Sequence, residues 1–113
     1  MDRSKVPAVL SIAGSDSSGG AGIQADIKTI TAHRLYAETA ITAITAQNTL
    51  GVTAVQNISP DIVAAQIDAV FDDIRPNAVK IGMVSSAEII EVIAERLSAW
   101  LSLIHISEPT RLQ

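Results

Sequence analysis

The pattern of apolar and polar residues predicts a chain in which strands and helices alternate. Short runs of β-branched and small apolar residues occupy residues 8–13, 39–46 and 78–81, and each run ends at glycine or polar residues. Each run is followed by a stretch with helical spacing of apolar residues, as Ile23, Ile27 and Ile30 show at positions i, i+4 and i+7. This order predicts an α/β fold with a mainly parallel sheet.

The expected helices cover residues 20–33, residues 60–73 and a stretch that begins with the capping box at residues 85–88 and ends at about residue 99. Ser59 and Pro60 are typical of a helix start, with serine as the N-cap and proline at the first helical position. The tetrapeptide from Ser85 to Glu88 matches a capping box for the last helix. Residues 51–56 are expected to form a short extended segment.

Glycine-rich or polar segments follow each of the three predicted strands. They are residues 14–22, residues 47–49 and residues 82–83. Ligands of open parallel sheets bind outside the carboxyl ends of the strands, where such segments meet. The sequence therefore predicts a single binding site formed by all three.

The glycine-rich loop, residues 14–22, precedes a helix and so has the general form of an anion-binding device. It matches neither nucleotide fingerprint. A Walker A loop needs lysine at the helix start, whereas Lys28 lies a full turn later and follows no glycine. A dinucleotide loop needs a different glycine spacing and an acid near the end of the second strand, where this chain has Gln47.

Five polar or flexible side chains near these strand ends each have two interpretations. Asp16 either accepts hydrogen bonds from a ligand or forms an Asx turn within the loop. Asp26 lies off the apolar helix face and either points towards the loop end of the strand or, as we favour, is a solvated carboxylate. Gln47 suits the edge of a heteroaromatic ring or caps a strand end. Met83 is either a site wall or, as we favour, ordinary packing. Lys80 is either a catalytic group or, as we favour, a charge at the sheet end.

Composition excludes several classes of function. The chain has 113 residues, 12 acidic against 8 basic, and the basic residues are scattered, which argues against a nucleic-acid partner. It has no cysteine, and His33 and His105 lack metal-ligand spacing, so we expect no metal site. With neither a signal peptide nor a stretch suited to a membrane, we expect a cytoplasmic protein without a membrane partner.

Three segments in register resemble the hydroxymethylpyrimidine/phosphomethylpyrimidine kinases of thiamine biosynthesis. They are residues 11–29, residues 42–49 ending in Thr-Ala-Gln-Asn-Thr, and residues 79–83, within a resemblance that covers about residues 6–97. The resemblance implies a ribokinase-like fold and a homodimer. It also implies transfer of phosphate from ATP, with Mg²⁺, to a hydroxymethylpyrimidine and then to its monophosphate. Some relatives of this family phosphorylate pyridoxal-type substrates.

The resemblance also implies which residues surround the pyrimidine ring: Gly14, Ala21, Asp26, Gln47 and Met83. In that arrangement Gln47 hydrogen-bonds the ring nitrogen and amino group, and Met83 packs on the ring face. The glycine-rich loop would then hold the acceptor substrate and not ATP, which accounts for the failure of both nucleotide fingerprints.

The family carries its ATP site, its Gly-Thr-Gly-Cys-type anion hole and its catalytic base in a C-terminal half that has no counterpart in this chain. We therefore expect no catalytic, cofactor-binding or metal-binding residue here, and an inactive fragment that keeps only the pyrimidine-binding part. Two other interpretations are a fragment of a pyridoxal- or pyridoxamine-type vitamin kinase and a non-catalytic pyrimidine-binding module.

The last residues depart from the family. Residues 101–111 resemble the translation of a transposon-end adapter used in sequencing libraries. We therefore expect residues 1–100 to be the N-terminal part of a kinase domain and residues 101–113 to be a non-native tail. The alternative is a divergent strand, since Leu103 to Ile106 has β character.

Overall fold

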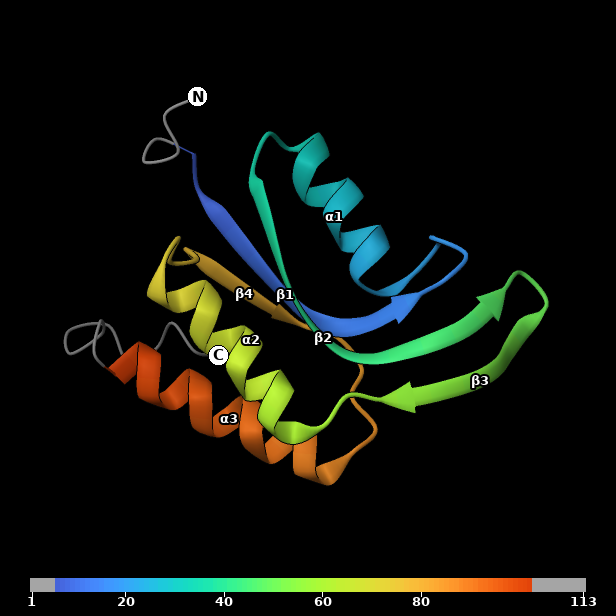
Figure 1. Cartoon of the computed structure of the whole chain (residues 1–113). Coiled ribbons are helices and arrows are strands. Elements are labelled where there is room, and N and C mark those ends of the chain that lie inside the picture. The colour runs from blue at the N-terminus through green and yellow to red at the C-terminus, as the bar shows by residue number, and fades with distance from the viewer. Residues whose placement is uncertain (1–5, 103–113) are drawn as a thin grey trace.

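The computed structural model describes residues 6–102, which form a four-stranded sheet with helices on both faces. One helix covers one face, and the other two pack side by side on the opposite face (Figure 1). In chain order the elements are β1 (Ala8–Asp16), α1 (Gly22–Ala32), β2 (Tyr36–Asn48), β3 (Gly51–Asn57), α2 (Pro60–Asp72), β4 (Ala78–Ile81) and α3 (Ala87–Ser102).

The strand order is β3-β2-β1-β4, with β1 paired in parallel to both β2 and β4. The predicted α/β fold with a mainly parallel sheet is therefore confirmed. The expected extended segment is β3, which folds back antiparallel on β2 through a tight turn. This β2–β3 arm reaches beyond the rest of the sheet (Figure 1), and every residue of β3 is exposed.

Two strands are longer than the apolar runs that predicted them. β1 continues through Gly14 to Asp16, and the end of β2 reaches Asn48. The ladder continues because its hydrogen bonds come from the backbone, so Ser15 and Asp16 pair with β2 although they are polar. The register between β1 and β2 shifts at Gly14, an irregularity of the kind found beside binding sites.

The helix caps agree with the sequence only in part. Ser59 and Pro60 begin α2 as predicted, but the Ser59 side chain makes no capping hydrogen bond. The predicted position of the N-cap of α3 is wrong by one residue. The Ile89 N–H donates to Ser86 Oγ at 3.3 Å, so Ser86 and not Ser85 caps the helix. That places Ile89 and not Glu88 at the third helical position. α3 also continues past the expected end at Ala99 to Ser102.

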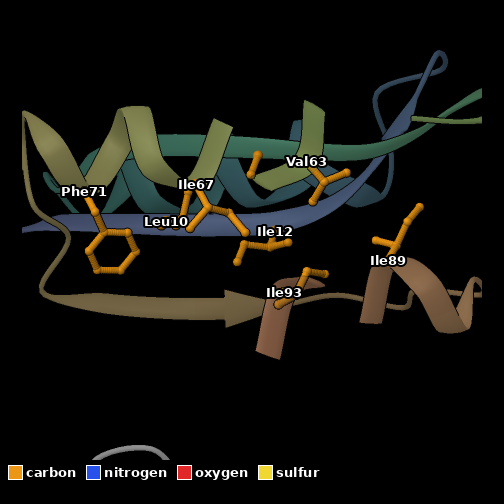
Figure 2. Close-up of a cluster of buried hydrophobic side chains, with 8 residues drawn as sticks. Leu10, Ile12, Val63, Ile67, Phe71, Ile89 and Ile93 are labelled. Atoms are coloured by element: carbon orange, nitrogen blue, oxygen red, sulfur yellow. The ribbon is translucent and has the colours of Figure 1, made fainter. Parts of the chain in front are cut away.

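The main core lies between the sheet and the α2–α3 pair (Figure 2). It joins side chains of β1 and β2 to the inner faces of both helices, namely Leu10, Ile12, Ala40, Val63, Ile67, Phe71, Ile89 and Ile93. Phe71 stacks on Trp100 with ring centroids 5.6 Å apart. On the other face α1 buries Ile23 and Ile30, whereas Ile27 is 38% exposed, so the predicted apolar stripe of that helix is only partly buried.

The outer edge of β4 is unpaired among the described residues, since β4 is the last strand of the order. Beside it lies an apolar groove of about 290 Å³ between β4 and α3, lined by residues such as Ile81, Ile90 and Leu97. Ile81 and Ile90 are about half exposed. Leu101, assigned by sequence to the tail, packs against the core at the end of α3, and residues 103–113 lie outside the described residues. No helix within residues 6–102 has the length and apolar character needed to cross a membrane.

Glu38 on β2 is a carboxylate in an unfavourable environment. Its Oε1 is buried and has no hydrogen-bond partner among the described residues. Burial, and secondarily the charge of Asp73, raises the pKa of Glu38 to about 7. A raised carboxyl pKa means that the folded state favours the protonated form, so stability is highest below the ordinary pKa and falls as the pH rises through 7.

We therefore expect Glu38→Gln to stabilise the chain at pH 8 by about 1 kcal/mol, after allowance for the solvent around this side chain, and to have little effect at pH 5. Urea unfolding at the two pH values measures the difference. Asp61→Asn, which changes an exposed carboxylate in the first turn of α2, is the control. An equal gain for Glu38→Gln at both pH values would show that desolvation of the charge is not the cause.

Candidate substrate site

A cavity of about 420 Å³ lies at the carboxyl ends of the parallel strands. Its wall includes residues from all three segments that the sequence singled out: Gly14, Ala21 and Gly22 from the loop, Gln47 from the end of β2, and Gly82 and Met83 after β4. The β2–β3 arm and the start of α3 complete it through Thr45, Val55, Asn57 and Ile89. The predicted convergence of these segments is confirmed.

The glycine-rich loop owes its shape to a close approach of two glycines. Gly22 has φ +58°, a conformation that L residues rarely adopt, and a Cβ there would overlap the carbonyl oxygen of Gly14. Ser15 and Gly22 also form an isolated antiparallel bridge. The chain thus leaves β1, turns and returns against the same strand before α1 begins, which keeps the cavity open above Gly14.

Asp16 organises the loop from within. Its carboxylate accepts hydrogen bonds from the Ser18 N–H at 2.8 Å, the Ser18 hydroxyl at 2.7 Å and the Gly20 N–H at 3.0 Å. These bonds, led by that of the Ser18 hydroxyl, hold the pKa of Asp16 below its ordinary value. Of its two interpretations, the Asx turn is the one that the geometry supports.

The same contacts bear on whether this loop fits the phosphates of a nucleotide. The amides of Ser18 and Gly20 are engaged by a carboxylate, and that negative charge sits where an anion would bind. Lys28 donates to the Gly19 carbonyl at 2.8 Å and so braces the loop from outside. The loop therefore does not fit an ATP phosphate chain, in agreement with its failure to match either nucleotide fingerprint.

Gln47 is held at the cavity by its backbone. The hydroxyl of Ser17 donates to the Gln47 carbonyl and accepts from the Gln47 N–H, both at 2.7 Å. Thr45 Oγ1 lies 3.1 Å from Gln47 Oε1, but its single proton has a closer acceptor in the Ser15 carbonyl oxygen at 2.8 Å. Within the described part of the chain Gln47 Nε2 has no partner, so the amide can still offer a donor to a ligand. The glycine-rich loop and the end of β2 are thus fixed to each other at Gln47.

Met83 is 95% exposed, so the favoured interpretation as ordinary packing is wrong. The residue before it is fixed, because the Gly82 N–H donates to the Ile12 carbonyl at 2.8 Å. Met83 therefore stands at the cavity wall with its side chain free of the core, an arrangement that suits contact with an apolar ring face.

Asp26 does not belong to the cavity wall. Its carboxylate, 15% exposed, accepts a hydrogen bond from Ser11 Oγ at 2.7 Å, and Lys80 Nζ lies 2.8 and 2.9 Å from its two oxygens. Burial pushes the pKa of Asp26 up, but the bonds from Lys80 and Ser11 outweigh it and leave the pKa below its ordinary value. The expected solvated carboxylate is therefore wrong, and Lys80, which does line the cavity, stands between Asp26 and that space.

Several residues of the site carried no clear sequence signal. Asn57 lies on β3 outside every segment that the sequence singled out, whereas Ser17 and Thr45 lie inside such segments without being distinguished from their polar neighbours. Lys80 was assigned to the sheet end, although its position two residues before Gly82 was a signal that it lies at the site. Within residues 6–102 no group of three or more His, Cys, Asp or Glu side chains is placed to hold a metal ion.

The family model for phosphomethylpyrimidine kinase matches residues 16–109. The chain belongs to the phosphomethylpyrimidine kinase family. It is 65% identical over 88 residues to the hydroxymethylpyrimidine/phosphomethylpyrimidine kinase of Rhizobium meliloti, a match that covers 78% of this chain and 33% of that protein. The Escherichia coli kinase of the same name is 55% identical over 91 residues, covering 80% and 34%.

Solved structures support the same family assignment. The crystal structure of phosphomethylpyrimidine kinase from Clostridium difficile 630 superposes with a TM-score of 0.82 at 60% identity, covering 84% of this chain and 41% of that one. The pyridoxal kinase of Staphylococcus aureus in complex with AMP-PCP and pyridoxal gives 0.73 at 37% identity, covering 83% and 35%. The fold is thus the ribokinase-like one that the resemblance implied, and the chain spans about a third of the length of its curated relatives.

Proposed function

We propose that this chain is the acceptor-binding part of a kinase that phosphorylates 4-amino-5-hydroxymethyl-2-methylpyrimidine and then its monophosphate, in thiamine diphosphate synthesis. The observation that carries the proposal is the cavity at the strand ends, where Gln47 and Met83 flank a glycine-lined floor. Gln47 offers a donor and an acceptor to the ring nitrogen and amino group. Met83 offers a polarisable side chain to the ring face, and Gly14 and Ala21 leave room for the ring.

ATP and Mg²⁺ belong to this proposal as cofactors of a whole enzyme. The Asp16 carboxylate already accepts hydrogen bonds from amides of the glycine-rich loop, and residues 6–102 contain no cluster of metal ligands. We therefore assign nucleotide, metal and catalytic base to the two thirds of the relatives that this chain does not span. We place the protein in the cytoplasm, as a homodimer when whole, and we propose that residues 101–113 are the non-native tail described above.

A chimera tests the proposal. Residues 1–100 are joined to the remaining two thirds of the Rhizobium meliloti relative, and phosphorylation of the hydroxymethylpyrimidine and of pyridoxal is measured. We expect activity on the pyrimidine from the chimera and none from the 113-residue chain. Nuclear magnetic resonance titration of the chain alone should show weak pyrimidine binding, since its cavity lacks the walls that the rest of the enzyme supplies.

Gln47→Leu should lower pyrimidine affinity by more than tenfold, because the ring edge loses both hydrogen bonds. Gln56→Leu makes the same change on the exposed strand β3, between the lining residues Val55 and Asn57 but not itself part of the cavity wall, and should have no effect. A chimera that prefers pyridoxal would support the second candidate, which the likeness to the Staphylococcus aureus pyridoxal kinase favours. Tight pyrimidine binding by the 113-residue chain alone would instead support a non-catalytic module.

A further inference from the structure

Lys80 occupies a defined place in the sheet. It lies on β4 opposite Ser11 of β1 in the parallel register, one residue before the strand ends. Its side chain is 55% exposed and forms part of the cavity wall. Among the described residues that line this cavity, Lys80 is the one cation, and the one anion, Asp16, already accepts the hydrogen bonds of the loop.

The Asp26 carboxylate holds the ammonium group of Lys80 in place. Asp26 on α1 contacts it with both carboxylate oxygens, at 2.8 and 2.9 Å, and is itself fixed by the buried hydroxyl of Ser11. An ammonium group has three N–H donors, and two of them face Asp26. The third is left for the cavity, so the ion pair positions a donor there and compensates the partly buried carboxylate at the same time.

We propose that Lys80 is the residue by which this site distinguishes the phosphorylated pyrimidine from the free alcohol, donating its remaining N–H to a phosphate oxygen. The inference rests on the proposed function and adds to it a specificity-determining residue. A phosphate ester carries charge that a charge-assisted hydrogen bond recognises, whereas the neutral alcohol gains much less from the same donor. Asp26 and Ser11 act through Lys80 as positioning residues.

Gln47 and Lys80 line the same cavity, on strands β2 and β4 that flank β1. Lys80 is level with Thr39 of β2 in the register, so Gln47 lies further along the sheet, towards the carboxyl ends of the strands. When Gln47 holds one edge of a pyrimidine ring, the phosphorylated substituent of that ring can extend towards the other side of the cavity. Both residues therefore face one continuous space, and the proposal requires the phosphate group to extend along the sheet from Gln47 towards Lys80.

The test measures the ratio of affinities for the monophosphate and the alcohol, by titration of the 113-residue chain. The ratio of KM values of the chimera is a second and independent readout. We expect the unmodified chain to prefer the monophosphate by about tenfold. Lys80→Met alone would leave Asp26 without its partner, so the informative variant is the double change Lys80→Met with Asp26→Asn, which removes both charges and keeps a hydrogen-bonding side chain beside Ser11.

The double variant should bind both ligands with equal affinity. Lys80→Arg and Asp26→Asn each keep the cation and should keep most of the preference. Arg75→Met removes one positive charge at Trp100, away from the cavity wall, and should leave the ratio unchanged. A double variant that keeps the tenfold preference overturns the inference, as does an unmodified protein that binds both pyrimidines equally. Failure of the unmodified chain and the chimera to take either pyrimidine would instead overturn the proposed function, and the inference with it.

Discussion

Replacing Gly22 with alanine is expected to destabilise the chain by about 3–5 kcal/mol and to close the candidate site. Two effects add. The backbone of Gly22 is in the left-handed region, where a side chain is strained, and the new methyl group would overlap the carbonyl oxygen of Gly14. Relief of that overlap has to move the loop away from β1, and the loop provides Ala21 and Asp16 to the cavity. Thermal unfolding and pyrimidine titration of the same sample measure both consequences.

Gly51→Ala is the matched control. Gly51 also has a positive φ, at +147°, but an added Cβ would meet nothing within 4 Å. The control therefore contains the backbone strain without the collision, and we expect it to cost less and to leave pyrimidine binding unchanged. Equal losses for the two variants would mean that the contact between Gly22 and Gly14 does not determine the shape of the site.

Phe71→Ala should destabilise the chain by about 3–5 kcal/mol, a large part of the 5–15 kcal/mol expected for a domain of this size. Phe71 is 2% exposed, packs among the side chains of β1 and α2, and stacks on Trp100 of α3. Its removal leaves a cavity where α2, α3 and the sheet meet. Urea unfolding followed by far-ultraviolet circular dichroism measures the loss without relying on the fluorescence of Trp100, which the substitution itself alters.

Leu50→Ala provides the comparison for an exposed apolar side chain. Leu50 lies in the turn of the β2–β3 arm and is 94% exposed, so its truncation should change stability by less than about 0.5 kcal/mol. A Phe71 variant no less stable than the Leu50 variant would contradict the assignment of the core.

The sequence predicted the order of elements because apolar periodicity reports burial, and burial decides which faces of strands and helices pack. It predicted the ends of strands and the helix caps less well, because backbone hydrogen bonds determine them. Ser15 and Asp16 extend β1 through ladder hydrogen bonds, and Ser86 caps α3 in place of Ser85. Nothing in the apolar pattern distinguishes these choices, since each depends on which amide meets which acceptor in three dimensions.

The candidate site was likewise predictable only in part. The convergence of the loop with Gln47 and Met83 follows from strand topology alone, and sequence reasoning found it. The ion pair of Asp26 and Lys80 joins residues that are 54 positions apart in the sequence. The hydrogen bonds between Ser17 and Gln47 join residues that are 30 positions apart. All four residues lie in segments that carry the family resemblance, but the sequence does not say which of them pair, so only the assembled structure shows which carboxylate is compensated.

The described cavity wall comes entirely from residues between Ala13 and Ile89. A ribosome that makes a relative three times longer has therefore released this whole wall while most of the polypeptide is still to be synthesised. A molecule that binds the folded wall and not the unfolded chain shifts the folding equilibrium of such a nascent segment by mass action. Under the proposed function, we expect the acceptor pyrimidine to bind weakly to such a nascent segment before the remaining two thirds of the kinase are made.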